Sequence, residues 1–161
     1  MMILDATDRA LVAALQVDAQ LRLEDLAKLV HMVPSSVHER LRRLTRDAVI
    51  RGWTIDIDAS AFGLEVLAFI GVRSSKPCSK LLPAMESIPA IEEFHSVAGA
   101  LGLMLKVRVA NTSALLELIE QLRQIPGVEG TETSIVLKTQ IDRPTALPAD
   151  SVKQKARGRA G

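Results

Sequence analysis

Aromatic residues and cysteine are scarce in this sequence, and each shortage excludes a class of protein. One Trp, three Phe and no Tyr are too few rings for a stacking platform that binds single-stranded nucleic acid. The one cysteine, Cys78, excludes a disulfide within the chain. No secretory segment is found at the N-terminus, so we expect a reducing cytoplasm. No apolar run approaches the length that spans a membrane, so no membrane partner is expected.

Net charge is also low, at +1 over 161 residues. The chain as a whole is therefore no polycation, and any binding of nucleic acid must come from local clusters of positive charge. Hydrophobic residues make up 48% of the sequence, which is enough for one core, or for two small cores completed by oligomerisation.

The clusters of residues on which most enzymes depend are missing as well. His31, His38 and His95 lie far apart without a supporting motif, and Cys78 has no neighbouring base. Neither a phosphate-binding glycine loop nor the spacing of a zinc site occurs in the sequence. We therefore expect no enzymatic activity, no cofactor and no metal site.

One basic stretch, residues 34–50, stands out from this neutral background. Val37, Leu41 and Leu44 recur at the spacing of one helical face, and Pro34 suits a first helical turn. Five arginines fall between positions 40 and 51. A short basic helix with a polar tip is typical of a segment that enters the DNA major groove. Taken alone, a solvated charged face is an equally good interpretation.

Two shorter helices are predicted before this stretch. Asp5 is a good N-cap for the first, which runs to about Val17, and the second spans residues 23–30. Three short helices with few residues between the second and third favour a helix-turn-helix unit.

Five motifs of this region occur in a fixed order: Leu4-Asp5-x-x-Asp8, Asp25-Leu26-Ala27, Pro34, Glu39-Arg40-Leu41-Arg42-Arg43-Leu44 and Val49-Ile50-x-Gly52-Trp53. In order and spacing, they resemble the N-terminal half of the Lrp/AsnC (feast/famine) transcriptional regulators. The resemblance implies a winged or tri-helical helix-turn-helix DNA-binding domain over residues 1–52. Double-stranded DNA is then the expected partner.

Three residues depart from the family pattern. His31 and Ala48 stand where the family usually has Gly, and Val33 stands where Ser usually caps the recognition helix. Each change removes a residue that tolerates positive φ, or a capping oxygen, at a cost of about 0.5–1 kcal/mol. We expect the stability or the angle of the recognition helix to be affected, rather than its existence.

The DNA contacts are predicted from the polar face of the basic helix. Arg42 and Arg43 are expected to meet phosphates or a guanine edge. Glu39 could accept a bond from cytosine, although an ion pair with Arg43 is the commoner explanation. Arg40 points to the edge of the apolar stripe and favours a half-buried ion pair. The predicted DNA-binding set is Ser35, Ser36, His38, Glu39, Arg42, Arg43 and Arg46.

The second half of the chain predicts a ferredoxin-like βαββαβ domain over residues 64–141, which makes the protein α+β. Strands are expected at residues 64–72, 91–98, 101–109 and 128–137, with helices at 79–87 and 113–124. The run Ile88-Pro89-Ala90-Ile91-Glu92 returns as Ile125-Pro126-Gly127-Val128-Glu129. In each run, proline ends a helix and a strand follows.

Two further segments complete the organisation. Residues 53–63 read as a linker strand, which the resemblance implies pairs with its copy in a partner subunit, with Trp53 packing at the joint. Residues 142–161 read as a disordered tail. Its basic residues could attract DNA, but a solubilising end is the better interpretation.

Residues 64–72 are apolar on both alternating faces. Helices can cover one face, so we expect a second subunit to cover the other. The resemblance implies a domain that binds an effector and assembles homodimers into a higher oligomer, an octamer in the family.

The effector loop of the family has a pattern close to Gly-x-x-Asp-Tyr. Here Gly99 is kept, but Ala100, Gly102 and Leu103 replace the acidic and aromatic positions. The ammonium group of an amino acid needs a carboxylate or several carbonyls when desolvated. We therefore predict a less polar ligand, weak binding of amino acids, or none. Thr131 and Thr133 could line the same site, although Thr pairs in strands are usually structural. The predicted effector-binding set is Gly99, Ala100, Leu101, Gly102, Leu103, Thr131 and Thr133.

These observations predict a sequence-specific DNA-binding transcription regulator that responds to an amino acid or another small metabolite. The alternative is a ligand-sensing oligomer with weakened or non-specific DNA binding, which the changes at His31 and Val33 favour.

Overall fold

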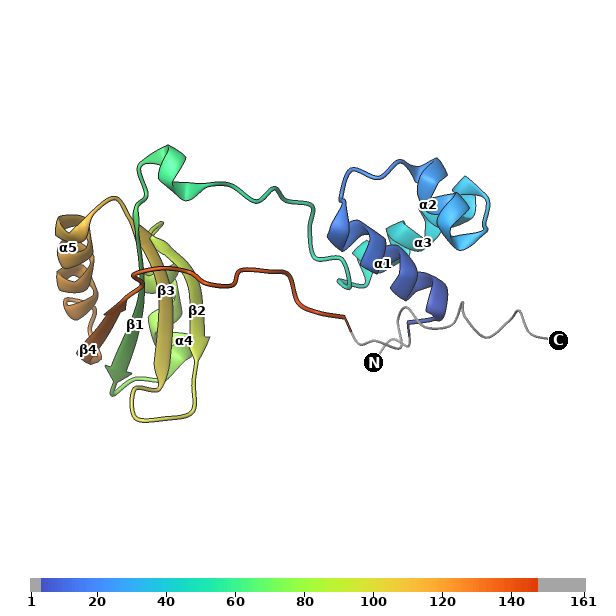
Figure 1. Ribbon diagram of the computed structural model, residues 1–161. Helices are drawn as coiled ribbons and strands as arrows, with labels where there is room; N and C mark the ends of the chain where they lie inside the picture. Colours follow the sequence, from blue (N-terminus) through green and yellow to red (C-terminus); the bar gives the residue numbers. More distant parts are fainter. Residues whose placement is uncertain (1–3, 148–161) are drawn as a thin grey trace. The chain divides into compact units, whose positions relative to one another are not determined.

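The computed structural model describes residues 4–147, and they fall into two compact units (Figure 1). One unit holds the N-terminal chain to Ile55 and the segment that begins at Asp142, and the other spans residues 56–141. None of the helices in the described part of the chain combines the length and the apolar character needed to cross a lipid bilayer.

The first unit contains three helices, α1 (Ala6–Val17), α2 (Leu23–Val30) and α3 (Pro34–Arg46). α1 begins in a capping box, in which the Asp5 side chain accepts a hydrogen bond from the backbone N–H of Asp8 and the Asp8 side chain accepts one from that of Asp5. The buried apolar residues of this unit are Leu11, Leu26, Ala27 and Val37, which form one cluster, and Leu44 of α3. Both the predicted cap and the helix-turn-helix arrangement are confirmed.

Two residues of this unit have a left-handed backbone. His31 ends α2 with φ 55°, and Ala48 follows α3 with φ 56°; within residues 4–147 these are the non-glycine residues with positive φ. They are the two positions at which the family usually has Gly. α3 also begins without a side-chain cap, because its N-cap residue is Val33. The departures noted in the sequence therefore fall on real backbone strain and on a real missing cap.

The second unit is a four-stranded antiparallel sheet in the order β2-β3-β1-β4. Its strands are β1 (Val66–Ser74), β2 (Ile91–Ser96), β3 (Leu103–Val109) and β4 (Val128–Ile135), and its helices are α4 (Cys78–Glu86) and α5 (Thr112–Arg123). The chain order βαββαβ with this strand order confirms the predicted ferredoxin-like sandwich.

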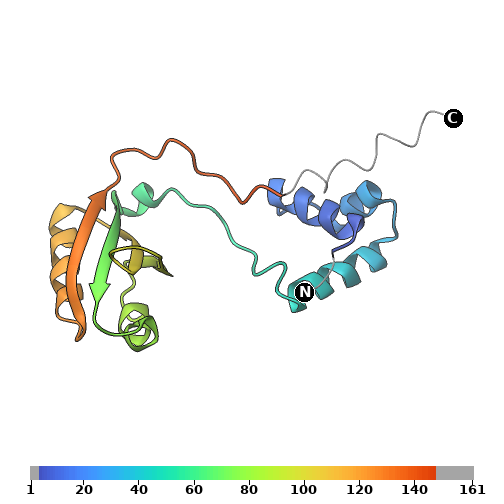
Figure 2. The same cartoon turned by 90° about the horizontal axis from the view of Figure 1, so that it is seen from below.

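Both helices pack on one face of the sheet. Ala68, Ile70 and Val72 of β1 are fully buried in one cluster with Leu81 of α4 and Leu118 of α5. α5 lies along the sheet beside β4 (Figure 2). On the other face of β1, the Phe69 side chain is 40% exposed. The helices thus cover one face only, and the cover of the other face by a second subunit stays a prediction.

The segments outside the units' helices and strands bear on three expectations. Residues 51–58 form neither strand nor helix within the single chain, and a short 3-10 helix, η1 (Ala59–Phe62), follows. The pairing of a linker strand with a partner subunit stays a prediction. Of the expected disordered tail, residues 148–161 lie outside the described residues. Residues 142–147 form neither strand nor helix, and the Gln16 side chain donates a hydrogen bond to the carbonyl of Thr145.

Candidate nucleic-acid interface

The polar face of α3 is the strongest candidate for a binding surface. Ser35, His38, Glu39, Arg42 and Arg46 are exposed, and successive residues turn by about 100° around a helix, so these side chains share one side. The Arg42 and Arg46 side chains are each 70% exposed. α3 is held from beneath by Val37 and Leu44, which are fully buried.

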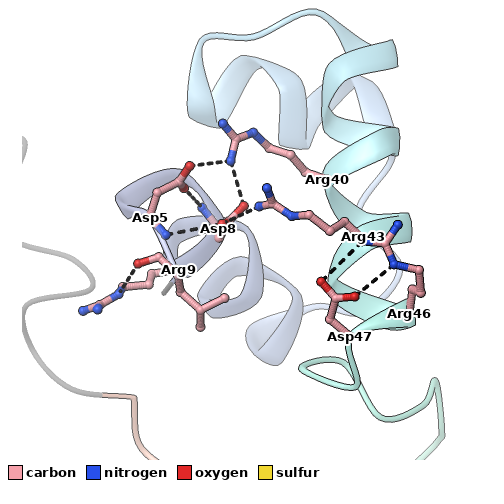
Figure 3. A network of polar contacts seen from close by, with 8 residues as sticks. Asp5, Asp8, Arg9, Arg40, Arg43, Arg46 and Asp47 are labelled. Carbon is pink, nitrogen blue, oxygen red and sulfur yellow. Dashed lines mark hydrogen bonds and ion pairs between the residues drawn. The ribbon is translucent and has the colours of Figure 1, made fainter. Parts of the chain in front are cut away.

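Two arginines on the flank of α3 are not free. The Arg40 Nη1 donates to Asp5 Oδ2 at 2.6 Å and to Asp8 Oδ1 at 2.8 Å, and the Arg43 Nη2 donates to Asp8 Oδ2 at 2.6 Å (Figure 3). The Arg40 side chain is 24% exposed. The predicted half-buried ion pair of Arg40 is thereby confirmed, and its partners prove to be the capping carboxylates of α1.

The pairing expected between Glu39 and Arg43 is wrong. Glu39 instead lies 3.5 Å from the Arg42 guanidinium, with both side chains about two-thirds exposed. Arg43 turns toward Asp8, which is 1% exposed. A carboxylate buried to this extent needs a positive partner far more than an exposed glutamate does. The sequence signal for this contact is the pair Asp5 and Asp8, whose side chains also form the capping box of α1.

The charges of this network shift two pKa values. Burial raises the pKa of the Asp5 carboxyl, but the hydrogen bond from the Asp8 backbone and the attraction of Arg40 and Arg43 outweigh it, so the pKa lies below 3.8. Hydrogen bonds to Asp5 and Asp8 raise the pKa of the Arg40 guanidinium above its ordinary value. Both shifts favour the charged pair in the folded state.

A hollow of about 540 Å³ lies along α3 and places the one tryptophan beside the candidate surface. The Trp53 side chain is 54% exposed. The hollow is lined by His38, Glu39, Leu41, Arg42, Arg43, Thr45, Arg46 and Trp53. Trp53 belongs to the same unit as α3, so its fluorescence should change when a ligand binds to the polar face of α3.

The residues predicted to bind an effector lie in the second unit, and the structure separates them. Gly99, Ala100, Leu101 and Gly102 form the loop between β2 and β3, with φ 146° at Gly99 and 76° at Gly102. The Leu101 side chain lies over Gly71, where a Cβ would overlap it. Gly71 alternates with Ile70 and Val72, so Leu101 covers the face of the sheet away from the helices.

Leu103, Thr131 and Thr133 point to the opposite face. Leu103 and Thr131 pair with Val72, and Thr133 pairs with Ile70; residues directly opposite each other share a face. Leu103 is 6% exposed within the core, which favours a packing role, and its place in an effector site stays a prediction. The Thr131 hydroxyl accepts a hydrogen bond at 3.0 Å from the Nε of Arg123 in α5, which favours the structural interpretation of this threonine.

Both units match known protein families. Residues 4–45 match the AsnC-type helix-turn-helix domain, and residues 67–146 match the Lrp/AsnC ligand binding domain. Over 146 residues, the chain is 35% identical to the HTH-type transcriptional regulator FL11 of Pyrococcus horikoshii, which covers 90% of this chain and 96% of that one. Over 144 residues, it is 30% identical to the regulatory protein AsnC of Escherichia coli K12, with coverages of 88% and 95%.

A solved structure is similar over nearly the same range. It is the feast or famine regulatory protein from Mycobacterium tuberculosis complexed with L-methionine, with a TM-score of 0.84 and 32% sequence identity. The alignment covers 91% of this chain and 100% of that one.

Proposed function

Because this chain belongs to the Lrp/AsnC family of transcriptional regulators, we propose that it recognises a specific double-stranded DNA site through the exposed face of α3. Its helix-turn-helix unit is the DNA-binding domain of that family. The observation that carries the proposal is the position of Arg42 and Arg46, which extend from a helix whose other side is buried. Regulators of this family are not enzymes, and we propose no catalytic activity and a cytoplasmic location for this one.

The start of α3 supplies the shorter contacts. Ser35 and Ser36 lie in its first turn, and within residues 4–147 neither hydroxyl has a hydrogen-bond partner. In helix-turn-helix proteins, the N-terminal residues of the recognition helix contact base edges. Ser35, Ser36 and His38 are therefore the proposed contacts to bases or to the DNA backbone.

The arginines supply the attraction to phosphates. The ion pairs of Arg42 with Glu39 and of Arg46 with Asp47 lie at the surface, where such pairs contribute about 0–1 kcal/mol. Either arginine can therefore exchange its carboxylate for a phosphate at small cost. Arg43 is left out of the proposed contacts because its guanidinium is held by Asp8.

A titration of DNA tests this proposal. The full-length protein is titrated with a duplex selected for binding from a randomised pool, and the fluorescence of Trp53 reports binding, since the sequence has one Trp and no Tyr. Log affinity should fall linearly with log salt. Arg42→Gln and Arg46→Gln should each lower the slope by about 0.9. Arg73→Gln, an exposed arginine in the second unit, is the matched control. Unchanged affinity and slope in both variants of α3 would refute the proposal.

A second candidate function rests on the strain at His31 and Ala48 and on the missing cap at Val33. These features favour a ligand-sensing oligomer whose DNA binding has become weak or non-specific. The same titration with a duplex of random sequence separates the two functions. A much higher affinity for the selected duplex supports specific regulation, and equal affinities support the alternative.

The second unit is the ligand-binding domain of the family, and we propose that its effector is less polar than a free amino acid or that it binds amino acids weakly. A similar protein is known in complex with L-methionine. In this chain the β2–β3 loop, residues 97–102, carries no acidic side chain that could pair with an ammonium group. A thermal-shift panel of the amino acids should give small shifts. A large shift that Gly102→Ala abolishes would contradict the proposal.

We also propose that homodimers form and assemble further, to the octamer that the family resemblance implies. The support is the uncovered face of the sheet, on which Leu67 is half-buried and Phe69 is 40% exposed within the single chain. A second copy of this chain would cover such a face.

A further inference from the structure

Asp8 lies between α1 and α3, and its carboxylate is fully engaged. Oδ1 accepts from Arg40 Nη1 at 2.8 Å, and Oδ2 accepts from Arg43 Nη2 at 2.6 Å and from the backbone N–H of Asp5 at 3.3 Å (Figure 3). At 1% exposure, Asp8 is the one charged residue that is fully buried among the described residues. A charge in this position is tolerated only because both oxygens are paired.

Arg43 is oriented by this contact rather than by solvent. Its Nε is buried and has no hydrogen-bond partner in the described part of the chain, and its side chain is 38% exposed. The guanidinium thus lies over Asp8 with its charge already matched. The preceding residue, Arg42, is 70% exposed and its guanidinium lies beside Glu39 on the polar face of α3.

The two ends of α3 do little to fix its direction. Val33 gives the first turn no side-chain cap, and Ala48 holds a strained backbone beyond the last turn. Between them, Val37 and Leu44 are fully buried. Apolar packing has little directional preference, whereas hydrogen-bonded ion pairs fix distance and angle.

We propose that Asp8 is a positioning residue for DNA binding. By holding Arg40 and Arg43 it sets the angle and the rotation of α3, so that Ser35, Arg42 and Arg46 face the DNA together. Arg43 fixes the position of α3 through its ion pair with Asp8 and does not contact a phosphate. This inference rests on the proposed function, because it assumes that α3 is the element that meets DNA.

The salt dependence of DNA binding distinguishes a positioning residue from a residue that contacts a phosphate. Asp8→Asn and Arg43→Gln should each lower the affinity for the selected duplex about tenfold, equivalent to about 1.4 kcal/mol, with no change in the salt slope. Arg42→Gln, in contrast, should lower the slope by about 0.9. The double variant Asp8→Asn/Arg43→Gln should lose no more affinity for DNA than whichever single variant loses more, because both changes remove the same contact.

Two controls distinguish positioning from a loss of folded protein. All titrations are made where circular dichroism shows each variant to be folded, and Asp25→Asn, an exposed carboxylate on α2 that pairs with Lys28, is the matched control. A smaller folded fraction lowers the affinity for the selected and the random duplex by the same factor. A misplaced helix instead lowers the ratio of the affinity for the selected duplex to that for the random duplex. If Asp8→Asn does not fold, Asp8→Glu replaces it, since this variant keeps the charge but moves the carboxylate by one methylene group.

The outcomes are decisive in both directions. A lower ratio with an unchanged slope in the Asp8 and Arg43 variants supports the inference. Unchanged affinity in the folded Asp8 variant, or a slope lowered by about 0.9 in Arg43→Gln, overturns it. If Arg42→Gln and Arg46→Gln still weaken binding in that case, the proposed function stands and the positioning role alone has failed.

Discussion

The two units of this protein reach a stable fold in different ways. The buried cluster of the second unit contains 13 apolar residues, which come from β1, β3, α4 and α5, with Ile88 between α4 and β2. The corresponding cluster of the first unit contains four, namely Leu11, Leu26, Ala27 and Val37. Beside this small core lies the network of Asp5, Asp8, Arg40 and Arg43. The comparison indicates that the DNA-binding unit depends on buried charge where the ligand-binding unit depends on apolar packing.

The largest loss of stability is expected when the ion pairs of Asp8 in the first unit are removed. Asp8→Asn leaves Arg40 and Arg43 with a weaker partner, and breaking a buried pair typically costs 3–5 kcal/mol, so we expect a loss of up to about 3–5 kcal/mol in the first unit. Chemical denaturation followed by Trp53 fluorescence measures it. Asp25→Asn should cost about 0–1 kcal/mol. A loss equally small in the Asp8 variant would show that the network does not stabilise the unit.

A cavity in the core of the second unit should lower the stability of that unit alone. Leu105 is fully buried in β3, and Leu105→Ala should cost about 2–5 kcal/mol through the cavity that it leaves. In denaturation, the circular dichroism signal of the sheet should move to lower denaturant while the Trp53 transition stays in place. A parallel shift of the two signals would show that the units unfold together, which removes the basis of the comparison.

The uncovered sheet face tests whether the apolar packing of the second unit extends to a partner. Phe69→Lys should weaken self-association at least about tenfold, because it places a charge in an apolar interface. Light scattering over a dilution series measures this. Leu116→Lys, on the solvent-exposed side of α5 with 58% exposure, is the matched control. An unchanged oligomer in the Phe69 variant would place the interface elsewhere.

The strained backbone of the first unit should respond to glycine. Ala48→Gly should stabilise the unit by about 0.5–1 kcal/mol, because glycine adopts positive φ without steric cost. His31→Gly should gain less, since His is among the residues enriched in the left-handed region. Thermal unfolding of the first unit measures both. A loss of stability in Ala48→Gly would mean that unfolded-state entropy outweighs the strain.

Acid should affect the first unit through Asp5, although the effect is the smallest because its side chain is half exposed. Its folded pKa lies below the ordinary 3.8, so the stabilisation is complete above about pH 4 and is lost as pH falls through the folded pKa. Asp5→Asn should flatten the acid limb of the first unit's stability curve by a few tenths of a kcal/mol. An unaltered limb would exclude this carboxylate as a contributor.

Much of the fold was predictable because local patterns and tertiary contacts agree. The stripe of Val37, Leu41 and Leu44 and the two Ile-Pro repeats mark helix and strand boundaries that the structure keeps to within a few residues. The effector set was less predictable. The side on which Leu103 and Thr131 lie depends on strand register, which loop motifs do not specify.

The arginines of α3 show the same limit at the level of single side chains. Helical spacing separates the stripe from the polar face, and it identified Arg40 as structural and Arg42 as exposed. The same spacing predicts a DNA contact for Arg43, at the edge of the polar face, whereas the structure pairs its guanidinium with Asp8. The partner of Arg43 is 35 residues earlier in the chain, so only the packing of α1 on α3 decides its role.

The contact of Leu101 with Gly71 has a consequence for how this sequence can vary through evolution. A side chain at position 71 requires the leucine at position 101 to change its conformation, because the added Cβ would overlap the end of the leucine side chain. Substitution at either position therefore changes what the other can accept. In an alignment of related sequences, a larger residue at the position of Gly71 should accompany a smaller one at the position of Leu101, and the pair should be inherited as a unit.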